Sequence, residues 1–349
     1  MMVAFRGGAA IDNAKWPSFD RDRMKSYPGI LLLGVALLAS ASTLALGQSD
    51  YPDHPVRVIV PFAPGGVVDV MARLLSQKLS GDLRENFYLQ NLGGAGGDIG
   101  TRNAASSTND GYSILMTSSS FVINPSLHAQ TPYDPIKDFE PISIAASSPN
   151  VVVVNPNVAA KNMQELGEAI RRDPDKYSFG SAGIGTTPHL SGELFRLSAG
   201  IKLVHVPFAG AGPALQATVG GFTPITFSSL PAAIPLIKGG LVRALAVTSP
   251  NRVSVLPDVP TMAEAGFPGQ EAATLLFVLA PAGTSTGIVN KLSIELRKVV
   301  ASSEVKSQFD TLGFSPLAMS PEESAKRVSE EIARWGKVIK DANIHEGGD

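Results

Sequence analysis

Cysteine is absent from this sequence of 349 residues, and its absence excludes several kinds of chemistry together. A chain without cysteine has no disulfide, no thiolate nucleophile and no Cys-ligated zinc or iron–sulfur centre. Charge is also sparse, because 29 basic side chains nearly balance 31 acidic ones and only 17% of the residues are charged. This composition gives no electrostatic reason to expect nucleic acid or an anionic membrane surface as a partner.

Sequence motifs for catalysis are missing as well. There is no GxxxxGK[ST] loop for phosphate and no GxSxG turn of a serine hydrolase. A partial dinucleotide motif at Gly183 and Gly185 has Pro188 where the third glycine belongs. The histidines are scattered, without the spacings that bind metals. We therefore expect no cofactor, no metal and no catalytic residues.

The N-terminal region has the pattern of an export signal. Residues 29–46 form an uncharged apolar run that follows a short basic patch and ends in small residues. We expect a cleavable signal peptide with cleavage near Gly47, and translation from either Met1 or Met24. An uncleaved membrane anchor is the alternative, since 18 residues is near the minimum length of a span. Export without cysteine indicates the bacterial periplasm.

Beyond this region, short β-branched and aliphatic runs alternate with helical patterns. The expected strands are residues 56–60, 113–116, 151–154, 177–180, 203–206, 225–228, 244–248 and 275–280. Residues 68–79 have the periodicity of an amphipathic helix, and capping boxes begin further helices at Asn162, Thr261 and Ser320. The alternation predicts the α/β class with parallel sheets, and the length predicts two of them.

Three expected strands run into glycine-bearing turns that lead to helices, at residues 61–69, 181–189 and 207–214. Parallel α/β proteins bind ligands at the carboxyl ends of their strands, and glycine there exposes N–H groups at the positive end of a helix. None of the turns contains Lys or Arg. Donors would therefore be amides and hydroxyls, which favours a carboxylate over a polyphosphate. A fourth glycine-rich segment, residues 93–100, either approaches the ligand or packs beneath the first turn.

A series of motifs runs through the chain from residue 51 to residue 344. In order they are YPDHPVRVIVPFAPGGVVDVMARLL, NLGGAGGDIG, DGYSILM, NPSL, YDPIKDFEPIS, YSFGSAGIGTTPHLSGELF, VHVPFAGAGPAL, LVRALAVTS, LPDVPTMAEAG, LAPAGT and EEIARWGKVIKDANI. This series resembles the tripartite tricarboxylate transporter substrate-binding proteins, also called the Bug family. The resemblance implies a monomeric periplasmic receptor that closes on a small organic carboxylate and hands it to membrane permease subunits.

The resemblance also implies a fold. It is the two-lobed type II periplasmic binding protein fold of the α/β class, with each lobe a mostly parallel sheet flanked by helices. Residues 1–47 would be an N-terminal extension and signal peptide, residues 48–148 with 275–349 the first lobe, and residues 149–274 the second. We expect the hinge near Pro149 and Ala273, and a C-terminal helix from Pro321 that returns to the first lobe.

In this family, all three glycine turns, residues 117–120 and the residue after the strand at 225–227 would contact the ligand. The ligand-binding residues that we expect are Phe62, Pro64, Gly65, Gly66, Asp69, Ser118, Ser119, Ser181, Gly183, Gly185, Thr186, Thr187, His189, Phe208, Ala209, Gly210, Gly212 and Ser228. Relatives often have Asp at the position of Ser228, and an aromatic residue where this chain has Thr274 to Leu276. Without that Asp a ligand amine loses its partner, which favours purely acidic or aromatic carboxylates over amino acids.

Two other functions stay open at this point. An exported enzyme would use Asp69 and His189 and would turn its carboxylate over, whereas a receptor returns it unchanged. Each of these residues also has a structural interpretation, as a complement to a helix N-terminus and as a hydrogen-bonding histidine in a helix's first turn. A sensor, finally, would present its closed form to a membrane kinase in place of a permease.

Overall fold

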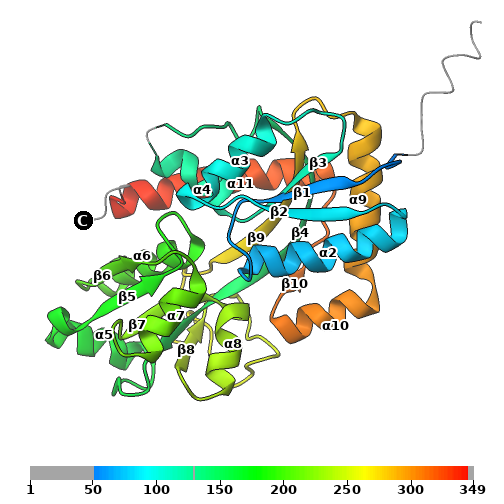
Figure 1. Cartoon of the computed structure of the whole chain (residues 1–349). Coiled ribbons are helices and arrows are strands. Elements are labelled where there is room, and N and C mark those ends of the chain that lie inside the picture. Colours follow the sequence, from blue (N-terminus) through cyan, green and yellow to red (C-terminus); the bar gives the residue numbers. More distant parts are fainter. Residues whose placement is uncertain (1–50, 129, 345–349) are drawn as a thin grey trace, which may run out of the picture. The chain divides into compact units, whose positions relative to one another are not determined.

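The structure is a computed structural model that describes residues 51–128 and 130–344 (Figure 1). The predicted signal peptide and its predicted cleavage site near Gly47 lie outside the described residues. Within the described part, none of the helices combines the length and apolar character that a membrane crossing needs. The described residues from Pro52 to Ile344 form a single compact unit.

Strands and helices alternate along the chain as the sequence predicts. The strands are β1 (Val56–Val60), β2 (Phe87–Asn91), β3 (Ser113–Thr117), β4 (Phe139–Val154), β5 (Ser178–Ser181), β6 (Val204–Pro207), β7 (Ile225–Ser229), β8 (Arg243–Val247), β9 (Ala273–Pro281) and β10 (Ser315–Pro316). The α-helices are α2 (Val67–Leu83), α3 (Asp98–Ala105), α4 (Ser120–Leu127), α5 (Met163–Arg172), α6 (Thr187–Ala199), α7 (Ala211–Val219), α8 (Leu230–Lys238), α9 (Thr286–Ala301), α10 (Ser303–Leu312) and α11 (Pro321–Ala342). The described residues also form the short 3₁₀ helices η2 (Ala95–Gly97) and η3 (Pro174–Lys176).

The strands join in a mixed sheet with the order β2-β1-β3-β9-β4-β7-β5-β6, and β8 and β10 pair with β4 beside this path. Pairing is parallel within β2-β1-β3 and within β7-β5-β6. It is antiparallel wherever β4 takes part, and between β3 and β9. Strand β4 is therefore common to both halves: its beginning pairs with β9, and its end pairs with β7 and β8 (Figure 1).

Strand β4 is much longer than the four residues predicted for it. The sequence criterion of a continuous apolar run fails from Ser143 to Asn150, where polar residues and Pro149 interrupt it. Tertiary hydrogen bonds give several of these polar groups a partner, although Asn150 Oδ1 has none. Ser143 Oγ donates to the Met319 carbonyl (2.8 Å), and the Asn150 N–H donates to Thr248 Oγ1 (2.8 Å). Burial of a polar strand is thus supported by partners that are distant in sequence.

Of the three capping boxes in the sequence, two begin helices in the structure and one does not. Asn162 caps α5 and Ser320 caps α11 with a complete box, as predicted. Thr261 and Glu264 also exchange capping hydrogen bonds, the Glu264 N–H to Thr261 Oγ1 (3.1 Å) and the Thr261 N–H to Glu264 Oε2 (2.8 Å). The expected helix is wrong, however, because this segment forms only turns. Gly266, with φ of +85°, ends it after one turn.

Hydrophobic clusters support both halves of the sheet, and a third cluster around Val151 and Leu230 packs between β4 and α8. In one, Trp335 of α11 is fully buried with Phe121 of α4 and Phe277 of β9. In another, Phe179 of β5 and Phe227 of β7 pack edge to face, with ring centroids 5.5 Å apart. Helix α11 packs on α4 and on β4, so the last described helix returns to the half of the sheet that contains β1 (Figure 1). The packing of these side chains holds the strands of both halves in place, and with them the turns that follow the strands.

Candidate functional site

The first glycine turn joins β1 to α2. Ala63, Pro64 and Gly65 at its tip are exposed. Gly66 is the N-cap of α2, in an extended conformation (φ −74°, ψ 168°), and no side chain caps the helix. The first N–H groups of a helix have no partner within it, so this helix start retains oriented donors at the positive end of its dipole.

Asp69 lies in the first turn of α2 and holds the preceding loop in place. Its Oδ2 accepts from the Gly65 N–H (2.9 Å) and from Arg73 Nε (2.9 Å). Its Oδ1 accepts from Arg73 Nη2 (3.0 Å) and from Asn91 Nδ2 (2.9 Å). Burial alone would raise the pKa of Asp69, but the hydrogen bonds from Arg73, Gly65 and Asn91 outweigh it and hold the pKa below its usual range. The group is thus an ionised carboxylate with hydrogen bonds from the protein on both oxygens.

The fourth glycine-rich segment packs against this first turn. A Cβ atom on Gly100 would lie 2.7 Å from Pro61 Cα and 2.6 Å from the Leu92 carbonyl oxygen, closer than any real contact allows. A Cβ atom on Gly97 would lie 3.2 Å from the ring of Phe62. Of the two alternatives for residues 93–100, the structure therefore shows close packing on the first turn.

The second glycine turn, between β5 and α6, is shaped by its own hydroxyls. Thr186 is the N-cap of α6, where its Oγ1 accepts from the His189 N–H (3.4 Å) and donates to the Gly183 carbonyl (2.7 Å). Ser181 Oγ accepts from the Gly183 N–H (3.2 Å). The serine and threonine that the sequence suggests as ligand donors therefore also fix the loop's conformation.

Two stacked histidines lie against the second turn. The rings of His189 and His205 are 4.0 Å apart and nearly parallel. His189 Nδ1 accepts from the Gly185 N–H (3.3 Å), and His205 Nε2 shares a hydrogen bond of 2.7 Å with Ser181 Oγ. Burial lowers the pKa of His189 to about 3 and that of His205 to about 4, so both rings are neutral at pH 7. His189 thus has the structural role of holding a loop amide.

The third glycine turn lies beside the second. The Phe208 N–H donates to the Ser181 carbonyl (3.1 Å). Gly210 is the N-cap of α7, and no side chain caps this helix either. Ala209 and Gly212, also expected in the site, are exposed on the same turn. A second helix start without a side-chain cap therefore lies next to the second turn.

Buried serines at the end of β3 connect the two halves of the sheet. Ser118 Oγ donates to Ser120 Oγ (3.3 Å), and Ser120 Oγ donates to the Gly185 carbonyl of the second turn (3.4 Å). Ser119 Oγ accepts from the Leu275 N–H (2.9 Å). The expected contact residues Ser118 and Ser119 thus belong to a polar junction with the second turn and β9.

The first and second turns lie on either side of Asn124, which begins the NPSL motif but is not among the ligand-binding residues that the sequence predicts. The ring of Phe62 lies next to Gly97, and Asn124 Nδ2 donates to the carbonyl of adjacent Gly96 (3.4 Å). On its other side, Asn124 Oδ1 lies 2.7 Å from where a Cβ atom on Gly185 would be. Asn124 therefore connects the second turn, at Gly185, with the segment that packs on Phe62 of the first turn.

Two other predicted residues, Ser228 and Thr187, form hydrogen bonds outside the contacts of Ser118, Ser120 and Asn124 with the second turn. Ser228, near the end of β7, is buried, and its Oγ donates to the Ser229 carbonyl (3.3 Å). Thr187 Oγ1 shares a hydrogen bond of 2.5 Å with Thr274 Oγ1 of β9. Asn91, which supports the first turn, was missed because it ends β2, a half-exposed strand without a continuous apolar run.

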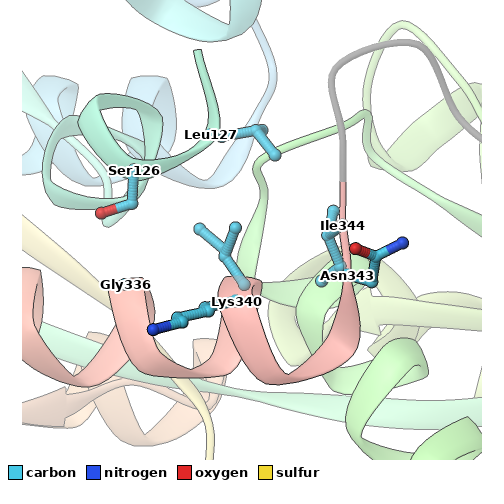
Figure 2. A pocket seen from close by; sticks show the side chains of 7 residues that line it. Ser126, Leu127, Gly336, Lys340, Asn343 and Ile344 are labelled. Carbon is cyan, nitrogen blue, oxygen red and sulfur yellow. The ribbon is translucent and has the colours of Figure 1, made fainter. Parts of the chain in front are cut away.

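The structure also contains a pocket of about 260 Å³ (Figure 2). It lies between the end of α4, which contributes Ser126 and Leu127, and the last turns of α11, which contribute Gly336 and Lys340 among others. None of the residues expected in the ligand site lines it. The glycine turns, with their oriented amides, remain the candidate site.

Comparison with known proteins identifies the relatives of this chain. The family model described as "Tripartite tricarboxylate transporter family receptor" matches residues 71–344. A protein of Pseudomonas sp. strain P51, described by its place in the tcbD-tcbE intergenic region, is 36% identical over 90% of this chain and 94% of its own. Protein BugT of Bordetella pertussis is 33% identical over 89% of this chain and 96% of its own.

Solved structures match the fold closely. The Rpa4515 protein of R. palustris with adipate has a TM-score of 0.82 and 34% identity, covering 84% of this chain and 99% of that one. The periplasmic binding protein BugD has a TM-score of 0.80 and 34% identity with the same coverage. MatC from Rhodopseudomonas palustris with bound malate has a TM-score of 0.77 and 30% identity over 83% of this chain and 100% of that one. The matches confirm the two-lobed periplasmic binding protein fold, and the matched family and BugD are described as a receptor and a binding protein.

Proposed function

The chain belongs to the tripartite tricarboxylate transporter receptor family, and on this premise we propose that it captures a small organic carboxylate between two lobes in the periplasm. It then delivers the acid, unchanged, to the permease subunits of a tripartite tricarboxylate-type transporter. The lobes are residues 48–148 with 275–349 and residues 149–274. The hinge lies where the pairing of β4 with β9 ends, at the pair Pro149 and Ala273, because β4 continues from there into the half that contains β7 and β8.

The helix starts at the glycine turns are the observation that carries the proposal. Helices α2 and α7 begin at Gly66 and Gly210, and neither has a side-chain cap. Helix N-termini bind anions through their free N–H groups and their dipole. The turns carry no Lys or Arg, so the donors suit a small carboxylate better than a polyphosphate. The adipate and malate of two matched structures are acids of this kind.

The remaining candidate contacts favour a ligand without an amine. Ser228 is a neutral, buried residue, so the site gains no carboxylate from this position. Asp69 is ionised, but both its oxygens accept hydrogen bonds from Gly65, Arg73 and Asn91. An ammonium group would therefore lack a free anionic partner at either residue. We propose purely acidic carboxylates, dicarboxylates first, as the ligand class.

A ligand screen by thermal shift tests the proposal. The mature chain from residue 48 would be melted with adipate, malate, benzoate and glutamate, because a ligand that binds only the folded state raises its stability by RT ln(1 + [L]/Kd). At a concentration of about 100 times Kd, the gain is about 2.7 kcal/mol. We expect a raised melting temperature with a dicarboxylate and none with glutamate.

The same samples distinguish a receptor from an enzyme. Chromatography of the acid after prolonged incubation with the protein would return it unchanged if the chain is a receptor. No shift with any of the acids, or a converted acid, would contradict the proposal.

A further inference from the structure

A buried carboxylate supports the first turn of a site proposed for carboxylates. The side chain of Asp69 is 3% exposed, one residue past the N–H groups of Val67 and Val68 at the start of α2. Like charges repel, and the repulsion grows where water is excluded. An uncompensated Asp69 would therefore oppose the binding of an anionic ligand at this helix start.

Arg73 supplies the compensating charge. Its guanidinium donates from Nε and Nη2 to the two carboxylate oxygens of Asp69, at 2.9 and 3.0 Å. Paired hydrogen bonds of this kind fix both position and charge. The Arg73 side chain is 56% exposed, so its own charge is hydrated while it neutralises the buried partner. The pair contributes no net charge to the turn.

The same carboxylate fixes the shape of the turn. It accepts from the Gly65 N–H at the end of the exposed tip, and from Asn91 Nδ2. The Asn91 amide also donates to the Phe62 carbonyl, at the beginning of the tip (3.0 Å). Residues on both sides of the tip are therefore held to one carboxylate, which leaves the amides that follow Gly65 oriented at the helix start.

We propose, on the premise of the function proposed above, that Asp69, Arg73 and Asn91 form a charge-balanced support that sets the preference of the first turn for dianionic acids. Asp69 is a positioning residue and does not touch the ligand. Arg73 determines specificity by cancelling the charge of Asp69, although the turn itself contains no basic residue.

Adipate and its monomethyl ester are the probes, since they have similar length and differ by one charge. Their dissociation constants would be measured by calorimetry for the mature wild-type chain, Arg73→Gln, Arg73→Lys and the double variant Asp69→Asn/Arg73→Gln. Lys78→Gln is the matched control, because it removes one positive charge from the same helix, where Lys78 pairs with Glu304. Melting curves without ligand show whether each variant is folded.

We expect Arg73→Gln to weaken adipate binding about tenfold and the monoester less, because the uncompensated charge of Asp69 acts on every ligand charge. The loss shrinks at about 0.5 M salt, where exposed charges are screened. Arg73→Lys keeps the charge and stays within about threefold of the wild type, and Lys78→Gln does not differ from it. The double variant regains most of the affinity, because it removes both charges.

A direct contact between Asp69 and the ligand predicts the opposite order, with the double variant binding worst. That result, or unchanged adipate affinity in Arg73→Gln, overturns the proposal. If Arg73→Gln does not fold, the double variant decides, because only charge balance predicts that it binds adipate nearly as the wild type does. Wild-type protein that binds no acid contradicts the proposed function instead, so the two failures are distinct.

Discussion

Gly66 is the N-cap of α2, and its lack of a side chain leaves the first amides of this helix accessible to a ligand. Its φ of −74° is available to any residue, and a Cβ atom there would come no closer than 3.6 Å to another group, the Ala63 carbonyl. The fold therefore accepts a side chain at this position. A large one, however, covers the amides at the start of α2, which is where the proposed carboxylate binds.

Replacing Gly66 with Leu should weaken adipate binding about tenfold to a hundredfold, since hydrogen bonds to a charged group contribute about 1.5–3 kcal/mol. Gly81→Leu is the matched control, because Gly81 lies in the same helix and a Cβ atom there would meet nothing within 4 Å. Calorimetry with adipate compares the two variants. Equal affinities in both would remove the first turn from the site.

At the scale of elements, the junction of β5, β6 and α6 depends on two neutral histidines. His189 and His205 have pKa values lowered by burial to about 3 and about 4, against about 6.5 in an unfolded chain. The unfolded state therefore binds more protons between these values, and stability rises with pH across that interval. The contribution is complete above pH 6.5 and is lost as the pH falls toward 4.

Lowering the pH from 7 to 5 should accordingly reduce the free energy of unfolding, by about 2 kcal/mol for a histidine with its pKa lowered to 4. Denaturant unfolding at a series of pH values measures this loss. In His205→Asn the slope of the free energy of unfolding with pH should be smaller than in the wild type, because one of the two buried rings is absent. An unchanged slope in His205→Asn would show that this ring is already protonated in the folded state.

At the scale of the whole molecule, strand β4 runs through both halves of the sheet, and the start of β9 meets it at Pro149. Contacts of α6 with α11, of α8 with α10, and of the second turn with Ser120 and Asn124 of α4 also connect the two halves. Elements that connect two halves by a few strands permit hinge closure, and donors from both halves favour the closed form when ligand is present.

Small-angle X-ray scattering of the mature chain should therefore show a smaller radius of gyration with saturating adipate than without it. Gly66→Leu should show no decrease at the same adipate concentration, since its first turn is blocked. Tight binding by the wild type without any decrease would contradict closure between lobes. That result would not contradict the proposed ligand class, which the thermal-shift screen tests separately.

The sequence by itself determined the α/β class, most of the strands and the three glycine turns, because these depend on local patterns. Runs of β-branched residues, capping boxes and glycine before a helix act within a few residues. It also determined the family, through motifs that extend over nearly the whole described chain. The helix at Thr261 was wrong because its cap is local but its continuation is stopped by Gly266.

Only the tertiary structure decided what the polar residues do. Asp69 follows the first turn in sequence, yet its partner Asn91 comes from the end of β2, and their hydrogen bond exists only once β1 and β2 are paired. Asn124 touches Gly185 across 61 positions of the chain for the same reason. Local propensity carries no information about such pairs, because a hydrogen bond between distant residues depends on the packing that brings them together.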